Sequence, residues 1–347
     1  HVDLRNPRKE NVQNVAPMKS YHGKPGMWID GGTHGNEYTG TEVTLYIIDK
    51  LVSGYDTDET ITNLIDDNVF YICPIVNPDG VYNSVERGIA QRQNGMPVDN
   101  DDDGQINEDG PDDLNGDGKI TSFRYPDPAG RYVIDDEDPR LMVQLPNGEE
   151  TTKERYAVVR EDKDNDGDGR RGEDGEAGID VNRNFPEGWF NDEPDGKRGG
   201  SGYYAASANE SRAILEFFTN NTNILLVQSF HTSGGFTYRP FARWPDSRIA
   251  AEDLDVFVIV LGPKFKVLHP SEEDPDRLWR PPYRGDRPYG FGIFIDWAYA
   301  QFGAYSMTTE LWNWSRDTRG LPGYDGEQDR NVWYRALLDY QETAFDG

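Results

Sequence analysis

Short apolar runs alternate along this chain with longer stretches whose apolar residues recur at helical spacing. The runs suited to strands are residues 27–30, 69–76, 224–230 and 304–309. The helix-like stretches are residues 38–51, 208–220, 249–268 and 329–345. This alternation predicts an α/β fold in which helices sandwich a mixed, mainly parallel sheet. We expect a single catalytic domain over residues 1–347, interrupted by an insertion at residues 93–178.

Composition excludes several classes of partner. The chain has 347 residues, a formal net charge of -28 and a pI near 4.4, whereas nucleic acids and anionic membranes select basic surfaces. No apolar stretch approaches the roughly 18–20 residues that a membrane-spanning helix needs. We therefore expect a soluble monomer with no nucleic-acid or membrane partner. Metal cations are the more natural counterpart of so much negative charge.

The acidic residues concentrate in the insertion, where they follow a repeat. Residues 99–110 read DNDDDGQINEDG, residues 164–175 read DNDGDGRRGEDG, and a third copy of the core, DLNGDG, occupies residues 113–118. Asp or Asn at positions 1, 3 and 5 with glycine at position 6 is the ligand spacing of EF-hand-type calcium loops, although no copy has the glutamate at position 12. The candidate calcium ligands are Asp99, Asp101, Asp103, Asp109, Asp113, Asn115, Asp117, Asp164, Asp166, Asp168 and Asp174.

We interpret the insertion as a loop-rich segment that binds two or three structural calcium ions. The alternative is a solvated acidic linker, but a random acidic tract does not keep glycine in phase with alternating aspartate. Calcium loops of this kind, in a chain that begins at His1 rather than Met, favour a secreted or periplasmic protein. The single cysteine, Cys73, lies in an apolar run, which predicts a buried and unreactive thiol.

His34 and Glu37 are the first candidates for chemistry. They stand three residues apart, shortly after the strand-like run at residues 27–30. Imidazole nitrogen and carboxylate oxygen are ligands that zinc takes, and a catalytic zinc needs three protein ligands with a fourth position for water. The His-x-x-Glu motif alone often arises by chance. A zinc site therefore requires a third ligand from elsewhere in the chain.

Polar residues follow or end each of the four expected strands. His34 and Glu37 follow the first, Asn77 follows the second, His231 follows the third, and Glu310 closes the fourth. Functional groups in open α/β sheets gather just beyond the strand ends, so these residues are expected to meet at one edge. His231 is the best third ligand, because the other histidines are terminal or lie in Pro/Gly-rich or charged surroundings.

Seven motifs occur in a collinear order through most of the chain. They are His34-Gly-Asn-Glu37, Asn77-Pro-Asp-Gly80, Arg92, Asp180-Val-Asn182-Arg183-Asn-Phe185, Ser229-Phe-His231, Ile295-Asp296-Trp297 and Thr309-Glu310-Leu311. In these motifs the chain resembles the zinc carboxypeptidases of the carboxypeptidase A type. The resemblance implies their α/β fold, which is phosphorylase/hydrolase-like, in a bacterial-type member with inserted calcium loops.

The resemblance also implies a role for each matched residue. His34, Glu37 and His231 match the ligands of one catalytic zinc. Glu310 matches the general base, and Arg92 matches the arginine that polarises the scissile carbonyl. These roles agree with physical chemistry, because zinc acidifies water, a carboxylate takes the proton as water attacks the amide, and a fixed guanidinium stabilises the oxyanion.

The positions that match substrate binding indicate an exopeptidase. Asn182 and Arg183 match the pair that binds the substrate's terminal carboxylate, a task suited to the bidentate fork of arginine. Tyr289 stands one residue out of register with the family's mobile tyrosine, and Ile295 matches the base of the pocket for the last side chain. An apolar base favours an apolar or aromatic terminal residue. Arg239 and other arginines of the pocket-forming stretch leave an acidic terminal residue open.

The leading interpretation is a zinc metallocarboxypeptidase that acts on peptide or protein C-termini. Two alternatives remain: an amidase or deacylase of the same fold, acting on cell-wall peptides or small acylamino acids, and a non-catalytic calcium-dependent binding module. The family usually has more sequence before its His-x-x-Glu motif and a shorter connection where this chain carries its insertion. We expect calcium in the insertion to rigidify the segment that positions Asn182 and Arg183.

Overall fold

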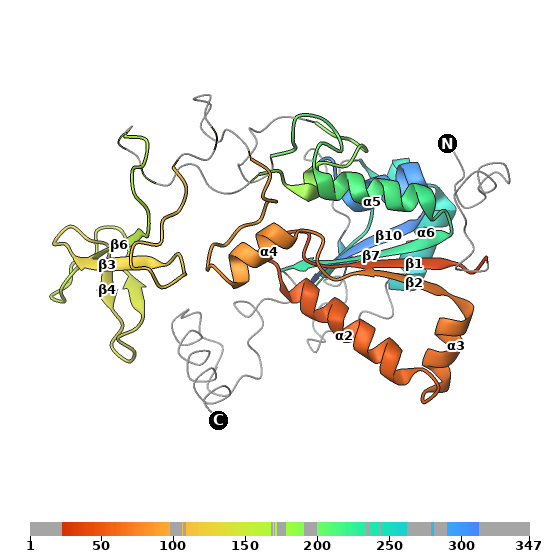
Figure 1. The fold of residues 1–347 in the computed structure, drawn as a ribbon, viewed down its shortest axis with the longest axis horizontal. Coiled ribbons are helices and arrows are strands. Elements are labelled where there is room, and N and C mark those ends of the chain that lie inside the picture. Colours follow the sequence, from red (N-terminus) through yellow and green to blue (C-terminus); the bar gives the residue numbers. More distant parts are fainter. Residues whose placement is uncertain are drawn as a thin grey trace. The chain divides into compact units, whose positions relative to one another are not determined.

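The computed structural model describes residues 23–97, 106, 109–167, 169, 171, 178–190, 200–233, 236–242, 244–261, 279–280 and 290–311 (Figure 1). The chain divides into two compact units, which we treat separately. The first draws on residues 1–111 and 164–311, and the second contains residues 112–163. The helix predicted at residues 329–345, and the part of the helix predicted at 249–268 that follows residue 261, lie outside the described residues.

The first unit is built on a six-stranded sheet in the order β2-β1-β7-β10-β8-β9. Its strands are β1 (Gly26–Asp30), β2 (Val69–Cys73), β7 (Ile224–Thr232), β8 (Phe236–Tyr238), β9 (Trp279–Arg280) and β10 (Tyr305–Leu311). Neighbours from β2 to β10 pair in parallel, β8 pairs antiparallel with β10, and β9 pairs parallel with β8. The predicted mixed, mainly parallel sheet is confirmed, and all four predicted strands belong to it.

Helices lie on both sides of this sheet, with α2 and α5 on opposite sides of β1 and β7 in Figure 1. The helices are α2 (Thr39–Gly54), α3 (Glu59–Asp67), α4 (Pro78–Val85), α5 (Asn209–Asn220), α6 (Ala251–Leu261) and α7 (Phe294–Trp297), with short turns η2 (Val181–Arg183), η3 (Asp246–Arg248) and η6 (Ala298–Phe302). Helices α2, α5 and α6 correspond to predicted ones. Within the described ranges, no helix is both long and apolar enough to cross a membrane.

An aromatic cluster joins β1 to α5. The ring of Trp28 lies 5.2 Å from that of Phe218 and 5.3 Å from that of Phe217. Phe218 is fully buried and also contacts the rings of Trp297 and Phe302. Aromatic pairs at such separations add to the stabilisation that burial provides, and truncating a ring like that of Phe218 costs about 3–5 kcal/mol. The cluster fixes the strand whose far end leads into the candidate site.

Glycines allow the turn after β1 to lie close to its neighbours. Gly32 has a φ of 62°, a conformation that residues with a side chain rarely adopt. A side chain at Gly35 would collide with the backbone of Gly80, at the start of α4. Asn77 caps that helix by accepting a hydrogen bond from Gly80 N at 2.9 Å. The two strand-end turns therefore pack backbone against backbone.

The second unit contains a four-stranded antiparallel sheet in the order β3-β6-β4-β5. Its strands are β3 (Ser122–Pro126), β4 (Tyr132–Ile134), β5 (Met142–Gln144) and β6 (Tyr156–Arg160). The apolar pattern did not predict these strands, because two of them have only 3 residues and β3 is exposed along its whole length. The insertion thus contains a small sheet in addition to loops.

Candidate metal centre and active site

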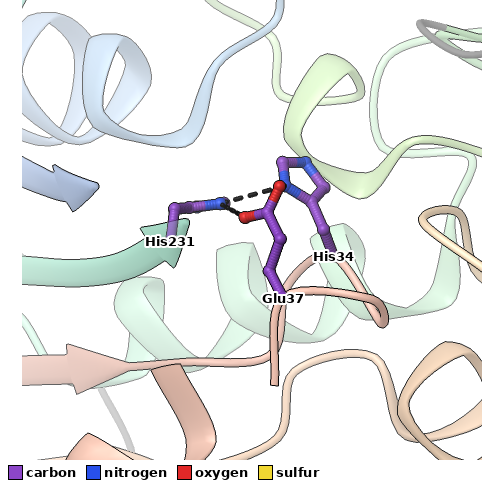
Figure 2. A group of neighbouring side chains, drawn as sticks. All are labelled: His34, Glu37 and His231. Carbon is purple, nitrogen blue, oxygen red and sulfur yellow. Dashed lines mark hydrogen bonds and ion pairs between the residues drawn. The ribbon is translucent and has the colours of Figure 1, made fainter. Parts of the chain in front are cut away.

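Three side chains that the sequence analysis selected meet at the carboxyl ends of β1 and β7 (Figure 2). The Nδ1 atoms of His34 and His231 lie 3.0 Å apart. Glu37 reaches both rings, with Oε1 2.9 Å from His34 Nδ1 and Oε2 2.9 Å from His231 Nδ1. Both histidines are buried, and the Glu37 side chain is 11% exposed. The structure therefore brings the predicted zinc ligands together.

Several elements assemble this group. His34 and Glu37 lie in the turn after β1, where Glu37 N donates to His34 O at 3.0 Å and turns both side chains to one side. His231 lies near the end of β7, paired in register with Glu310 of the parallel strand β10. Thr232 N donates to Glu37 Oε2 at 3.1 Å, which ties the end of β7 to the turn. The sheet edge, rather than one local motif, creates the geometry.

The donor set fits a zinc ion. One ligand atom from each of His34, Glu37 and His231 falls within 4.8 Å of the others, and within the described ranges this is the one group of three or more His, Cys, Asp or Glu side chains so arranged. Burial by itself would raise the pKa of Glu37, but the charges and hydrogen bonds of both histidines hold that pKa well below its ordinary value. An ionised carboxylate with two imidazole nitrogens is a ligand set that zinc prefers.

Asp180 supports this group from behind, a role that the sequence analysis did not assign. Its carboxylate is fully buried, with Oδ1 3.2 Å from His34 Nε2 and Oδ2 accepting from Arg92 Nε at 2.8 Å. Burial would raise the pKa of Asp180, but Arg92, His34 and Arg183 hold it well below its ordinary value. A carboxylate on the outer nitrogen of a histidine sets the ring's orientation and tautomer. Its place at the head of the Asp180-Val-Asn182-Arg183 motif was the signal available in the sequence.

Arg92 bridges a carboxylate of the metal group, by which we mean His34, Glu37 and His231, and the carboxylate of Asp180 behind it. Its Nη1 donates to Glu37 Oε1 at 3.0 Å, and its Nε donates to Asp180. Burial alone would lower the pKa of this guanidinium, but Asp180 and Glu37 raise it, so the group stays cationic. The carbonyl of Arg92 accepts hydrogen bonds from Gly35 N at 3.2 Å and from Asn77 Nδ2 at 3.3 Å. Backbone and side chain are thus both tied to the turn that carries His34 and Glu37.

Glu310 lies on β10 beside His231, at the same edge of the sheet. Burial raises the pKa of its carboxyl to about 7, against the opposing charge of His231 and with a further rise from Glu37. Arg92 and Arg183 also act on it and lower the pKa. A carboxyl group with a pKa near neutrality is suited to accepting a proton from water and giving it up again.

Asn182 and Arg183 belong to the short turn η2, which Asp180 caps by accepting from Asn182 N at 3.0 Å. Asn182 Oδ1 accepts a hydrogen bond from Phe294 N at 2.9 Å. That bond occupies the acceptor of the amide and leaves its Nδ2 as the group that can meet an anion. Arg183 Nη1 donates to the carbonyl of Asn182 at 2.8 Å. The two residues therefore offer an amide donor and a guanidinium side by side.

The predicted pocket base lies in an apolar environment. Ile295 is buried and packs with Ala242 and Ile293. Arg239 was one reason to consider a preference for an acidic last residue. Its side chain is fully buried. It donates from Nη2 to Asp246 Oδ2 at 2.7 Å and from Nη1 to the carbonyl of Pro240. Its charge already has a carboxylate partner within the chain. Tyr289 lies outside the described residues.

The predicted calcium ligands are only partly within the described residues. Asp113 accepts hydrogen bonds from backbone N–H groups of its own loop, at 2.7 Å from Gly116 N and Gly118 N. Asp109 is buried and accepts from Asn165 N at 2.8 Å, which links it to the loop that begins at Asp164. Asn115, Asp117 and Asp166 are also described. Those that lie outside the described residues are Asp99, Asp101, Asp103, Asp168 and Asp174.

A mainly parallel α/β sheet that gathers two histidines and a glutamate at its carboxyl edge, with a second, desolvated glutamate beside them, has the arrangement of a metal-dependent hydrolase. The sequence profile of one such family, the zinc carboxypeptidases, matches residues 5–121 and 141–322. The chain belongs to the zinc carboxypeptidase family. The resemblance found in the sequence motifs is thereby confirmed.

Known proteins show the same likeness. Carboxypeptidase A2 of Rattus norvegicus is 32% identical over 79 residues, which cover 23% of this chain and 19% of that protein. Carboxypeptidase M of Mus musculus is 37% identical over 84 residues, 24% of this chain and 19% of that protein. The match therefore spans only 19% of the length of either relative. The crystal structure of carboxypeptidase A from Helicoverpa armigera matches the fold with a TM-score of 0.50 and 16% identity, over 94% of this chain and 63% of that one.

Proposed function

We propose that this protein is a zinc metallocarboxypeptidase that hydrolyses the last peptide bond of peptides and proteins. The observation that carries the proposal is the meeting of Glu310 with the His34, Glu37 and His231 group at one sheet edge. Zinc held by those three residues would supply a Lewis acid that lowers the pKa of a water molecule. The buried Asp180 connects the group to Arg92, which supports a role for that arginine in the same reaction.

Glu310 acts as the general base in the proposed reaction. Its carboxylate accepts a proton from the water that attacks the scissile carbonyl carbon, and it returns that proton to the leaving amine as the carbon–nitrogen bond breaks. The guanidinium of Arg92, which stays cationic, stabilises the oxyanion of the tetrahedral intermediate. Asp180 keeps both Arg92 and His34 in orientation through one carboxylate, so neither group must reorganise during the reaction.

Asn182 and Arg183 bind the terminal carboxylate of the substrate in this proposal. The Nδ2 donor of Asn182 and the guanidinium of Arg183 together match the two oxygens of a carboxylate. The apolar surroundings of Ile295 and the ion pair that engages Arg239 support a preference for an apolar or aromatic last residue. An acidic last residue would bury an unpaired charge there, at a cost of several kcal/mol.

Hydrolysis of matched substrates tests the proposal. We expect the zinc-loaded protein to cleave an N-acylated dipeptide that ends in a free phenylalanine carboxylate at least about 100-fold faster than the same dipeptide amidated at that carboxylate. Equal cleavage of both would indicate an amidase or deacylase instead. A protein that neither retains zinc nor cleaves either substrate would indicate a non-catalytic binding module.

The calcium loops form a separate part of the proposal, supported by the spacing of their Asp, Asn and Gly residues. We propose that residues 99–118 and 164–175 bind two or three calcium ions, as suits a secreted or periplasmic enzyme. Isothermal titration of the zinc-loaded protein with calcium tests this directly. Absence of a saturable heat at millimolar calcium would contradict it, without bearing on the zinc site.

A further inference from the structure

Asn94 lies at the start of the insertion, at residues 93–178, but still within the first unit, and it is fully buried. Its backbone N donates to Ile179 O at 3.0 Å, and its carbonyl accepts from Gly178 N at 2.8 Å. Its side-chain Oδ1 accepts from Ile179 N at 2.8 Å and from Met96 N at 3.2 Å. One asparagine therefore joins the two ends of the insertion directly, because its bonds connect residues 94–96 to residues 178–179.

The two segments that Asn94 joins carry the polar residues of the proposed reaction. Arg92 stands two residues before Asn94, and Ile179 immediately precedes Asp180, which caps the turn that holds Asn182. A shift of residues 178–179 against residues 92–94 would move Asn182 relative to Arg92. The bond from Arg92 Nε to Asp180 is the next contact between the same two segments.

The side-chain amide nitrogen of Asn94 binds a carboxylate on helix α5. Its Nδ2 donates to Glu210 Oε2 at 2.7 Å, and Glu210 lies in the first turn of α5. This bond fixes which end of the amide faces Ile179, because the donor must point to the carboxylate and the acceptor to the backbone N–H. Asparagine thus satisfies a requirement that neither aspartate nor a shorter side chain meets at this position.

We propose that Asn94 is a positioning residue. By holding the two ends of the insertion together, it sets the distance between Arg92 and the carboxylate-binding pair Asn182–Arg183. The inference rests on the proposed function for the roles of those three residues. It assigns the alignment of substrate binding to a contact inside the first unit, in addition to any calcium in the acidic loops.

The substitution Asn94→Asp keeps the size of the side chain but sets a carboxylate against Glu210. We expect KM for the free-carboxylate dipeptide, and the inhibition constant of its amino-acid product, to rise about 10- to 100-fold while one zinc per chain is retained. A merely structural defect would lower the folded fraction and hence kcat, and it would leave KM unchanged. Adding Glu210→Gln restores a donor opposite the introduced carboxylate, and we expect the double variant to recover most of the wild-type KM.

Asn223→Asp is the matched control, because Asn223 Nδ2 likewise donates to an oxygen of another segment, the carbonyl of Lys24, at the opposite end of β7 from His231. We expect its KM to equal that of the wild type. If Asn94→Asp does not fold, Glu210→Ala removes the same bond from its helix side and is expected to raise KM about threefold. An unchanged KM in whichever variant folds, or no rescue by Glu210→Gln, overturns the inference. If the wild-type protein itself shows no preference for substrates with a free terminal carboxylate, the proposed function is overturned instead.

Discussion

The metal group and the loop at residues 113–118, the Asp113 loop, are both rich in carboxylates, but they differ in how far along the sequence the hydrogen-bond partners of those carboxylates lie. At the metal group, Glu37 meets His231 and Asp180 meets His34 across 194 and 146 residues of sequence, in buried surroundings. In the loop, Asp113 is exposed and accepts from N–H groups three and five residues further on. The first arrangement exists only in the folded sheet, whereas the second forms from its own short sequence. Changes at the first should affect chemistry, and changes at the second should affect local stability.

The largest expected effect belongs to Glu310→Gln. The amide has the shape of the carboxylate but cannot take a proton, so we expect kcat to fall about 10³-fold with one zinc per chain retained. Steady-state kinetics with metal analysis measures both quantities. Glu42→Gln, an exposed change in the first turn of α2, is the control and should retain wild-type kcat. A loss of less than about tenfold for Glu310→Gln would assign the base to another group.

Asp180→Asn should come next. The variant retains a polar group beside His34 but loses the charge that orients its ring, and we expect zinc affinity to fall about 10- to 100-fold. Competition against a chromogenic chelator measures that affinity. Asp58→Asn preserves a helix cap at the start of α3 and provides a control with the same chemical change. Equal zinc affinities for both variants would contradict the supporting role of Asp180.

The sequence predicted the four parallel strands and the grouping of His34, Glu37 and His231, because both leave a direct pattern. Apolar runs mark β1, β2, β7 and β10, and parallel strands of one sheet place the residues after them at one edge. His231 could be paired with His34 and Glu37 on that reasoning alone. A site formed by strand ends is thus readable before the fold is known.

Contacts between segments that are distant in sequence left no such pattern. The buried partners of Asp180, namely His34 and Arg92, depend on how η2 lies against the turn after β1. The sheet of β3 to β6 was missed because β4 and β5 have only 3 residues each and β3 is exposed along its length, which leaves too short a pattern of apolar and polar residues. Nor could the closing of the insertion at Asn94 be foreseen. Once its ends are held, a long insertion costs little, because each doubling of loop length adds only about 0.6 kcal/mol of closure entropy.

A smaller effect is expected in the pH dependence of stability, through the carboxyl group of Glu310. The pKa of Glu310 is about 7 in the folded protein and 4.5 ordinarily, so the folded carboxyl keeps a proton that the unfolded chain has lost. Its contribution to stability is fully present below pH 4.5 and is lost as the pH rises through 7. We therefore expect metal-free Glu310→Gln to be more stable than metal-free wild type by roughly 1–3 kcal/mol at about pH 8 and equally stable at about pH 4. Urea unfolding at both pH values measures this, and a constant difference would contradict the raised pKa.

The smallest effect is expected in the Asp113 loop. Asp113→Asn weakens a proposed calcium ligand and the hydrogen bonds of its own loop, so we expect Tm to fall by about 2–4 °C in calcium-containing buffer. Zinc content and kcat/KM should stay within about twofold of wild type. Differential scanning calorimetry and the dipeptide assay measure these quantities. A large loss of activity would show that the loop, and not Asn94 alone, sets the alignment of the substrate-binding residues.

The most direct test of the contrast is anomalous diffraction at the zinc edge from crystals of the zinc-loaded protein. We expect one strong peak, within about 2.0–2.2 Å of Nδ1 of His34, Nδ1 of His231 and the carboxylate of Glu37. We expect no zinc peak of comparable height at Asp113 or Asp164. Zinc bound in the acidic loops with none between the two histidines would contradict a catalytic zinc site at His34, Glu37 and His231.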